Sequence, residues 1–440
     1  MFGTSGVRGP VGREVTAETA LSVGRAVATT GATRVVVGRD VRGTGGMLVD
    51  ALAAGVVECG GDVVDLGVVS TPTLARSVPR TEADVGVVVT ASHNPPADNG
   101  IKLWTSEGRA FGTDRCSAVE SVVLDRAYEF ADWDETGTRR SDGGAESEHV
   151  DELVATFDEP VDCSVVVDVG NGTGGLTADV LDRVGCDVRT LNARPDGSFP
   201  GRPSEPTAAN CSTLRTVVAA TDADVGIAHD GDADRMRATD ANGRFVGGDA
   251  LLALFAREAV DPGDAVAAPL NTSLAVDRVL EKRGGEVVRT PVGDVHVAET
   301  AAEIGAPFGG EPSGAWIWPA ETPCPDGPLA ACELVRLVAE HGPLDELVDE
   351  LPSYPIRRDV VEAADPADRM TTITETLLDR YADASTLDGV RISTDDGWFL
   401  VRASGTQPLI RLTAEATSSA EADRLLDRAR NVVERCLTNG

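Results

Sequence analysis

A threefold rhythm of apolar strands and amphipathic helices constrains the fold of this chain more than any other feature. Three successive stretches, beginning near residues 33, 164 and 265, each run strand, helix, strand, helix, strand, and each ends in a polar cluster. Such alternation is typical of parallel βαβ units in doubly wound sheets. The segment from about residue 357 has short strands between two helical segments. The sequence therefore predicts an α/β protein with three similar doubly wound domains and a smaller α+β C-terminal domain.

The domain boundaries are expected at composition changes and at the ends of these stretches. The loop 133–148 is rich in Gly, Asp, Ser and Thr, which is typical of a linker. We expect domains over residues 1–148, 149–248, 249–356 and 357–440. The last strand of the first two stretches is expected at 84–89 and 224–228, and the third stretch ends at the motif 309–314.

The charge balance limits the classes of partner. The chain has 39 basic and 72 acidic residues, for a net charge of −33, and only Lys102 and Lys282 are lysines. Because such an acidic surface repels nucleic acid and anionic membranes, we expect neither as a partner. We interpret the acidity as adaptation to a cytoplasm of high salt concentration, where screening weakens the repulsion between surface charges.

Two further absences in the sequence bear on location and redox state. No apolar run reaches the length of a membrane span and no signal-peptide pattern begins the chain, so we expect a soluble, cytoplasmic protein. The eight cysteines are scattered without a Cys-x-x-Cys pair, which predicts small buried thiols rather than disulfides or a zinc site.

Ser92 lies in the run Thr90-Ala-Ser-His-Asn-Pro-Pro96, directly after the apolar segment Val85–Val89. That segment has the β-branched composition of a buried strand. Open α/β sheets bind their ligands at the carboxyl ends of strands, so Ser92 is placed to act as a nucleophile or a phosphoryl carrier. A plain turn would account for Asn-Pro-Pro alone, and the other motifs decide between the two.

Asp230-Gly-Asp-Ala-Asp-Arg235 follows another apolar strand and carries carboxylates at alternate positions. In an extended segment they would point to one side and converge on a divalent ion, and magnesium suits such oxygen ligands. The alternative is a solvated acidic turn. An EF-hand is excluded, because Arg235 stands where that loop needs glycine and Ala241 where it needs glutamate.

Lys102, in Asn99-Gly-Ile-Lys, stands out in a chain that has almost no lysine. Lysine can release its proton where its surroundings lower its pKa, whereas arginine cannot, so a site that transfers a proton would retain lysine. A surviving surface lysine is the alternative.

Three more segments have the composition of ligand loops. Arg402-Ala-Ser-Gly-Thr-Gln-Pro408 and Gly3-Thr-Ser-Gly-Val-Arg-Gly9 combine arginine, hydroxyls and glycine, as anion-binding loops do. Gly310-Glu-Pro-Ser-Gly314 offers a carboxylate and a hydroxyl that suit sugar hydroxyls.

Gly170-Asn-Gly-Thr-Gly-Gly175 fits a dinucleotide-binding pattern, but Asn192 stands where an acidic ribose ligand is expected. We therefore interpret the glycine-rich segment as a tight turn between a strand and a helix.

These motifs, in this order and over essentially the whole chain, resemble the α-D-phosphohexomutase family, and most of all its archaeal phosphoglucosamine-mutase-like branch. The resemblance implies four domains around one central cleft. It implies a phosphoserine at Ser92, which transfers its phosphoryl group to a sugar monophosphate and recovers the other phosphate from the bisphosphate intermediate. It also implies Mg²⁺, a sugar 1,6-bisphosphate as activator, a phosphosugar as the small-molecule partner, and a monomer or homodimer.

The resemblance also assigns roles to individual residues. Mg²⁺ would be held by Ser92 and the three aspartates, Asp230, Asp232 and Asp234. Lys102 would be the general acid or base, and the phosphoryl group would be surrounded by Arg8, His93 and Arg235. Sugar hydroxyls would be bound by Glu311 and Ser313. The non-reacting phosphate would be bound by Arg402, Ser404, Gly405 and Thr406.

Two departures from the family pattern leave the sugar open. Ala315 follows Gly314 where many members have histidine, and Gln407 stands where glutamate is common. Glucosamine, glucose and mannose phosphates all remain candidate substrates. The alternatives to a hexose mutase are a magnesium-dependent sugar phosphatase, a phosphopentomutase and an inactive phosphosugar-binding protein.

Overall fold

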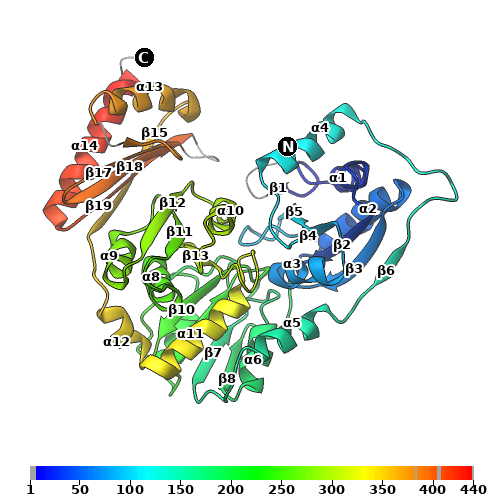
Figure 1. Ribbon diagram of the computed structural model, residues 1–440, viewed down its shortest axis with the longest axis horizontal. Helices are drawn as coiled ribbons and strands as arrows, with labels where there is room; N and C mark the ends of the chain where they lie inside the picture. The colour runs from blue at the N-terminus through cyan, green and yellow to red at the C-terminus, as the bar shows by residue number, and fades with distance from the viewer. Residues whose placement is uncertain (1–5, 382–383, 404–407, 439–440) are drawn as a thin grey trace.

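The protein is described by a computed structural model that covers residues 6–381, 384–403 and 408–438. Four β-sheets form four lobes that follow one another along a curved row (Figure 1). The first lobe, in blue and cyan, and the fourth, in orange and red, lie at the two ends of the row. The predicted α/β class is confirmed, with three α/β lobes and a smaller C-terminal lobe.

The first lobe contains a six-stranded sheet of order β1-β5-β4-β2-β3-β6. Strands β2, β3 and β4 are parallel, as the alternating pattern predicts, whereas β5 returns antiparallel to β4. The elements are β1 Val7–Pro10, α1 Ala17–Thr29, β2 Arg34–Arg39, α2 Gly45–Glu58, β3 Asp62–Val68, α3 Thr71–Arg80, β4 Val85–Val89, β5 Asp98–Thr105, α4 Thr113–Asp125 and β6 Arg139–Ser141.

The second and third lobes repeat this plan with four strands each, in the orders β10-β9-β7-β8 and β12-β11-β13-β14. The second comprises α5 Ala145–Val154, β7 Ser164–Asp168, α6 Leu176–Arg183, β8 Asp187–Leu191, α7 Ser212–Ala219, β9 Val225–His229 and β10 Met236–Asp240. The third comprises α8 Gly248–Ala259, β11 Ala265–Pro269, α9 Leu274–Arg283, β12 Glu286–Thr290, α10 Asp294–Ile304, β13 Gly309–Glu311, β14 Ala315–Ile317, α11 Gly327–His341 and α12 Leu344–Asp349.

The fourth lobe is a five-stranded sheet of order β15-β19-β18-β17-β16 in which every neighbouring pair is antiparallel. Its elements are β15 Ile356–Glu362, α13 Pro366–Leu378, β16 Ala384–Ser385, β17 Val390–Thr394, β18 Gly397–Ala403, β19 Leu409–Ala416 and α14 Ser419–Thr438.

A recurring hairpin positions the motifs of the first three lobes. In each, the last parallel strand is followed by a loop and then by an antiparallel partner, in the pairs β4–β5, β9–β10 and β13–β14. The loops of these hairpins hold Ser92, the three aspartates and the segment after Glu311. The sequence pattern placed the motifs after strands but did not predict the returning strands.

Buried side chains divide into a core for each end lobe and a shared core in the middle. One continuous apolar cluster includes Val165 and Ile227 of the second lobe together with Val266 and Leu334 of the third. Separate clusters lie beneath the first and fourth sheets. The middle lobes therefore pack as one unit. No helix in the described part of the chain is long and apolar enough to span a membrane.

The segment 133–148 is more structured than a linker. It contains β6, which pairs parallel with β3 at the edge of the first sheet, and the first turn of α5. All three β6 residues are exposed and polar, so neither apolar alternation nor burial marks this strand in the sequence. Backbone hydrogen bonds to β3, rather than burial of its side chains, hold this strand in the sheet.

Candidate active site

Ser92 is held in a buried, sharply turned loop between β4 and β5. The residue is 2% exposed and adopts φ 48°, in the left-handed region that non-glycine residues rarely occupy. Its backbone N–H donates to the Thr90 hydroxyl at 2.9 Å, and its Oγ donates to Asp230 Oδ2 at 2.6 Å. The loop therefore directs a strained serine at the aspartate cluster of the second lobe.

Arg42, which the sequence analysis did not identify, holds this loop in place. Its guanidinium is fully buried and donates to four carbonyl oxygens, those of Ser92, Asn94, Pro95 and Asp98. The remaining donor, Nε, bonds to Asp40 Oδ2 at 2.9 Å. All five N–H bonds of the guanidinium are thus used, so a single side chain defines the shape of the loop.

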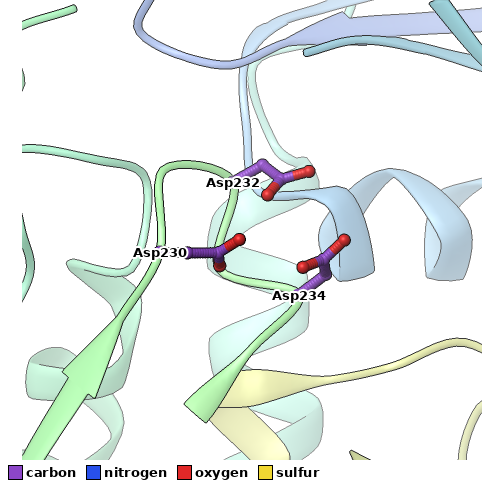
Figure 2. Close-up of side chains that lie close together, drawn as sticks. All are labelled: Asp230, Asp232 and Asp234. Atoms are coloured by element: carbon purple, nitrogen blue, oxygen red, sulfur yellow. The ribbon is translucent and has the colours of Figure 1, made fainter. Parts of the chain in front are cut away.

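Asp230, Asp232 and Asp234 bring their carboxylates together, as Figure 2 shows. One oxygen of each lies within 4.8 Å of the others, and all three residues are buried. The segment is not extended as expected: it is a turn in which Ala233 has φ 56°. The carboxylates converge because the turn curls around them rather than because alternate residues share a face.

The electrostatics of this cluster suit a divalent cation. Burial, with Asp234 and Asp232 adding to it, raises the pKa of Asp230 well above its usual value, and burial likewise raises the pKa of Asp234. Asp232 Oδ1 and Asp234 Oδ1 are buried with no hydrogen-bond partner among the described residues. Buried carboxylate oxygens need a polar or charged partner. Convergent carboxylate oxygens, two of which have no hydrogen-bond partner among the described residues, fit a divalent ion such as Mg²⁺.

Lys102 lies on β5 and reaches into the same cluster. Its Nζ lies 2.9 Å from Asp234 Oδ2 and 3.4 Å from Asp232 Oδ2. Burial alone would lower the pKa of Lys102, but the two carboxylates outweigh it and raise the pKa above its usual value. The sequence analysis expected surroundings that lower the pKa of this lysine, whereas next to these carboxylates Lys102 is a buried cation.

Three further predicted residues border the serine. His93 Nδ1 lies 3.3 Å from Ser92 Oγ, and burial, with Arg235 and Arg8 nearby, lowers the pKa of His93 to about 3. The imidazole is therefore neutral near pH 7. The Arg235 backbone N–H donates to Asp230 Oδ1 at 3.2 Å, and Arg8 on β1 lies 3.5 Å from the Asn94 side chain.

Close packing explains the glycine-rich segment that mimics a dinucleotide motif. A Cβ on Gly172 would lie 2.6 Å from the Gly231 carbonyl oxygen, and one on Gly174 would lie 2.8 Å from the His229 ring. These glycines let the loop press against the aspartate turn, where the Thr173 N–H bonds to the Gly231 carbonyl at 3.1 Å. The segment therefore supports the aspartate turn.

The segment with Glu311 and Ser313 is joined to the aspartate turn by backbone contacts. Arg235 and Ala315 form an isolated antiparallel bridge, and the Trp316 Nε1–H donates to the Met236 carbonyl at 2.9 Å. Burial, and then the nearby Asp294 carboxylate, raise the pKa of Glu311 to about 7. Ser313 Oγ is buried without a partner among the described residues. Ser313 lies close enough to Glu311 to act on its pKa, so the two side chains lie together.

The fourth lobe contributes Arg402, which lies close enough to affect the titration of Glu311. Its Nε pairs with Asp388 Oδ2 at 3.0 Å. The predicted phosphate ligands Ser404, Gly405 and Thr406, with Gln407, lie outside the described residues, as do residues 3–5 of the amino-terminal motif.

Two other residues beside the aspartates, Thr71 and Asp294, were missed by the sequence analysis. The Thr71 hydroxyl donates to Asp232 Oδ2 at 2.7 Å and its N–H to the Asp232 carbonyl at 2.9 Å, across 161 positions of sequence. Asp294, the first residue of α10, contributes negative potential at Lys102, Asp234, Arg235 and Glu311. Asp294 follows the end of β12, which a search of strand ends could have identified.

Comparison with known proteins supplies the wider context. Models of the phosphoglucomutase/phosphomannomutase family match four consecutive segments: α/β/α domain I over residues 1–129, domain II over 147–243, domain III over 247–354 and the C-terminal domain over 356–432.

Individual proteins resemble the chain over almost its full length. A probable phosphoglucosamine mutase of Methanopyrus kandleri is 47% identical over 99% of this chain and 98% of that protein, and one of Methanothermobacter thermautotrophicus is 45% identical over the same shares. A crystal structure of a phosphoglucomutase/phosphomannomutase family protein from Burkholderia thailandensis superposes with a TM-score of 0.88, at 29% identity over 99% of this chain and 98% of that chain.

Proposed function

The chain belongs to the phosphoglucomutase/phosphomannomutase family, the α-D-phosphohexomutases, and we propose that within it the protein is a phosphoglucosamine mutase. The reaction would be the interconversion of glucosamine 1-phosphate and glucosamine 6-phosphate. The choice of glucosamine rests on the two archaeal relatives of that name. The choice of a phosphoryl-transfer mechanism rests on the site itself.

The observation that carries the proposal is the contact between Ser92 Oγ and Asp230 Oδ2 at 2.6 Å, inside a cluster of three buried carboxylates. A hydroxyl so placed can carry a phosphoryl group. In the forward reaction the bond from phosphorus to Ser92 Oγ breaks as a sugar hydroxyl oxygen bonds to phosphorus; that hydroxyl loses its proton, Ser92 Oγ gains one, and a sugar bisphosphate results. After the bisphosphate turns end for end, its other phosphoryl group returns to Ser92.

The surrounding residues would position the groups and neutralise their charge, which is most of what phosphoryl transfer requires. Lys102 as a buried cation would donate a proton or stabilise charge at the serine oxygen, with Arg8 and Arg235 on the phosphoryl oxygens and neutral His93 beside them. The aspartates would hold Mg²⁺, which when bound neutralises charge on the transferring group. A sugar 1,6-bisphosphate would restore phospho-Ser92 after its loss to water.

The substrate would be held at two places away from the transferring group. Glu311 and Ser313 would bind sugar hydroxyls. The second phosphate would bind Arg402 with Ser404, Gly405 and Thr406, and because that anchor accepts either phosphate, one site would serve both orientations of the bisphosphate.

The two relatives named probable phosphoglucosamine mutase favour a mutase over a phosphatase. We propose a protein of the cytoplasm with a phosphosugar as its partner, and either a monomer or a homodimer.

The test is phosphorus NMR of the protein in high potassium chloride with Mg²⁺ and a trace of glucose 1,6-bisphosphate. Glucosamine, glucose, mannose and ribose phosphates are supplied one at a time. Exchange between the 1- and 6-phosphates of glucosamine, faster than for the other sugars, is the expected result. Release of inorganic phosphate alone would identify a phosphatase, and faster exchange of another sugar would reassign the substrate.

A further inference from the structure

One carboxylate oxygen of Asp388, in the fourth lobe, makes one contact within its own lobe and one contact with the third lobe. Asp388 Oδ2 lies 3.0 Å from Arg402 Nε and accepts a hydrogen bond from the Val292 backbone N–H at 3.2 Å. Val292 belongs to the loop between β12 and α10, and that loop ends at Asp294 beside the candidate active site. One carboxylate therefore joins the arginine of the fourth lobe to a loop of the third.

Local packing fixes Asp388 against Arg402. The next residue, Gly389, has φ 77°, and a Cβ there would lie 2.3 Å from the Val401 carbonyl oxygen and 3.0 Å from Arg402 Cα. Only glycine fits so close an approach, so the backbone that follows Asp388 lies directly against the Arg402 segment. An arginine bound through Nε keeps its two Nη groups for another anion.

The two lobes also meet at a second place, which differs in burial. Glu415 of the fourth lobe is 1% exposed and accepts from Ser273 Oγ at 2.5 Å, from the Leu274 N–H at 2.7 Å and from Trp398 Nε1 at 2.8 Å. The Asp388 side chain is 26% exposed and holds the third lobe by one backbone bond. The buried contact of Glu415 is typical of a permanent contact between lobes, whereas the partly exposed contact of Asp388 is typical of one that forms and breaks.

We propose that Asp388 is a positioning residue that orients Arg402 for the non-reacting phosphate and couples that phosphate to the loop 291–293 of the third lobe. The inference rests on the proposed function, because it takes the phosphate of a phosphosugar as the ligand of Arg402. Asp388 does not touch the substrate. It keeps Nε engaged, so that the guanidinium meets the phosphate in one orientation and the two lobes meet in one relative position.

A double-mutant cycle on ligand binding tests the proposal. Binding of glucose 1,6-bisphosphate is measured by titration calorimetry in a Ser92→Ala background, which prevents phosphoryl transfer, with Asp388→Ala and Arg402→Ala alone and together. Loss of a half-exposed ion pair and a backbone hydrogen bond should weaken binding about five- to tenfold where Arg402 is present. Where Arg402 is already alanine, Asp388→Ala should change the Kd by less than about twofold, because coupled residues are not additive.

Matched variants separate orientation from general effects. Asp395→Asn removes the same charge from an exposed turn of the same lobe and should leave the Kd unchanged. Asp388→Asn keeps a hydrogen-bond acceptor without the charge and should lie between the parent and Asp388→Ala. In the otherwise native enzyme, Asp388→Ala should raise KM with kcat nearly unchanged.

Three results would overturn the inference. An unchanged Kd in Asp388→Ala would show that Arg402 needs no positioning. Equal weakening with and without Arg402 would show that Asp388 acts on lobe packing alone, and tighter binding would show that it competes with the phosphate. If the native enzyme exchanges no phosphosugar and the Ser92→Ala protein binds no bisphosphate, the proposed function fails and this inference with it.

Discussion

Replacement of Arg42 by methionine is expected to destabilise the first lobe by about 3–5 kcal/mol, the usual cost of breaking a buried ion pair. Methionine retains much of the length and volume of arginine but donates no hydrogen bond. The change leaves four carbonyl oxygens of the loop 92–98 without their donor and the buried Asp40 carboxylate without its counter-charge.

The pH dependence of this loss follows from Asp40. Burial raises the pKa of Asp40 to about 6, although Arg42 opposes the shift. Without Arg42 that pKa should rise further, so at low pH the carboxyl is protonated and its burial costs less. The destabilisation should therefore be smaller near about pH 5 than near about pH 8, since a group with a raised pKa in the folded state loses stability as pH rises.

Thermal unfolding in high potassium chloride measures the effect. A loss of that size should lower Tm by about 6–20 °C, at about 2–4 °C per kcal/mol for a unit of this size. Hydrogen exchange should quicken in peptides that cover residues 90–100, and kcat should fall. Arg13→Met, at an exposed position of the same lobe, is the matched control and should leave all three unchanged.

An Arg42→Met protein that unfolds within about 1 kcal/mol of the native enzyme would refute this reasoning. So would equal losses at low and high pH, because the penalty would then not come from Asp40. The double variant Asp40→Asn with Arg42→Met should cost less than the sum of the two single changes, since it leaves no uncompensated buried charge.

Three other predictions concern the metal, the histidine and the surface. Thr71→Val removes the hydroxyl that bonds to Asp232 but keeps the backbone bond, and should weaken Mn²⁺ binding about 10- to 100-fold by electron paramagnetic resonance. His93, whose pKa burial and neighbouring cations lower to about 3, is neutral when folded but takes up a proton on unfolding below its ordinary pKa of 6.5. Stability should fall on acidification through that window, and the slope should be smaller by about 1.4 kcal/mol per pH unit in His93→Gln. With a net charge of −33, Tm should rise with potassium chloride, and a constant Tm would contradict the interpretation of salt adaptation.

Much of the fold could be predicted because apolar β-branched segments are easily recognised. The expected strands 84–89 and 224–228 agree within one residue at each end with β4 and β9, and the alternation of strands and helices led directly to the three α/β lobes. The edge strand β6 was missed because its residues are polar and exposed. The returning strands, such as β5, were missed because the alternation of strands and helices predicts parallel strand pairs only.

Some site residues can be recognised from the local sequence, whereas others depend on contacts between lobes. Ser92 and Asp230 could be predicted because each directly follows a buried strand. Asp40 also follows such a strand, β2, and the same rule would have identified it. Thr71 and Asp388 could not be predicted, since their roles depend on contacts with Asp232 and Val292 that only the packed lobes create.

The central claim is that Ser92 carries the phosphoryl group, and intact-protein mass spectrometry tests it most directly. The native enzyme and Ser92→Ala are each incubated with glucose 1,6-bisphosphate and Mg²⁺, and the modified peptide is then sequenced. The account predicts one added phosphoryl group on Ser92 in the native enzyme and none in the variant. A phosphoryl group on another residue, or exchange of phosphosugar by Ser92→Ala at the native rate, would contradict it.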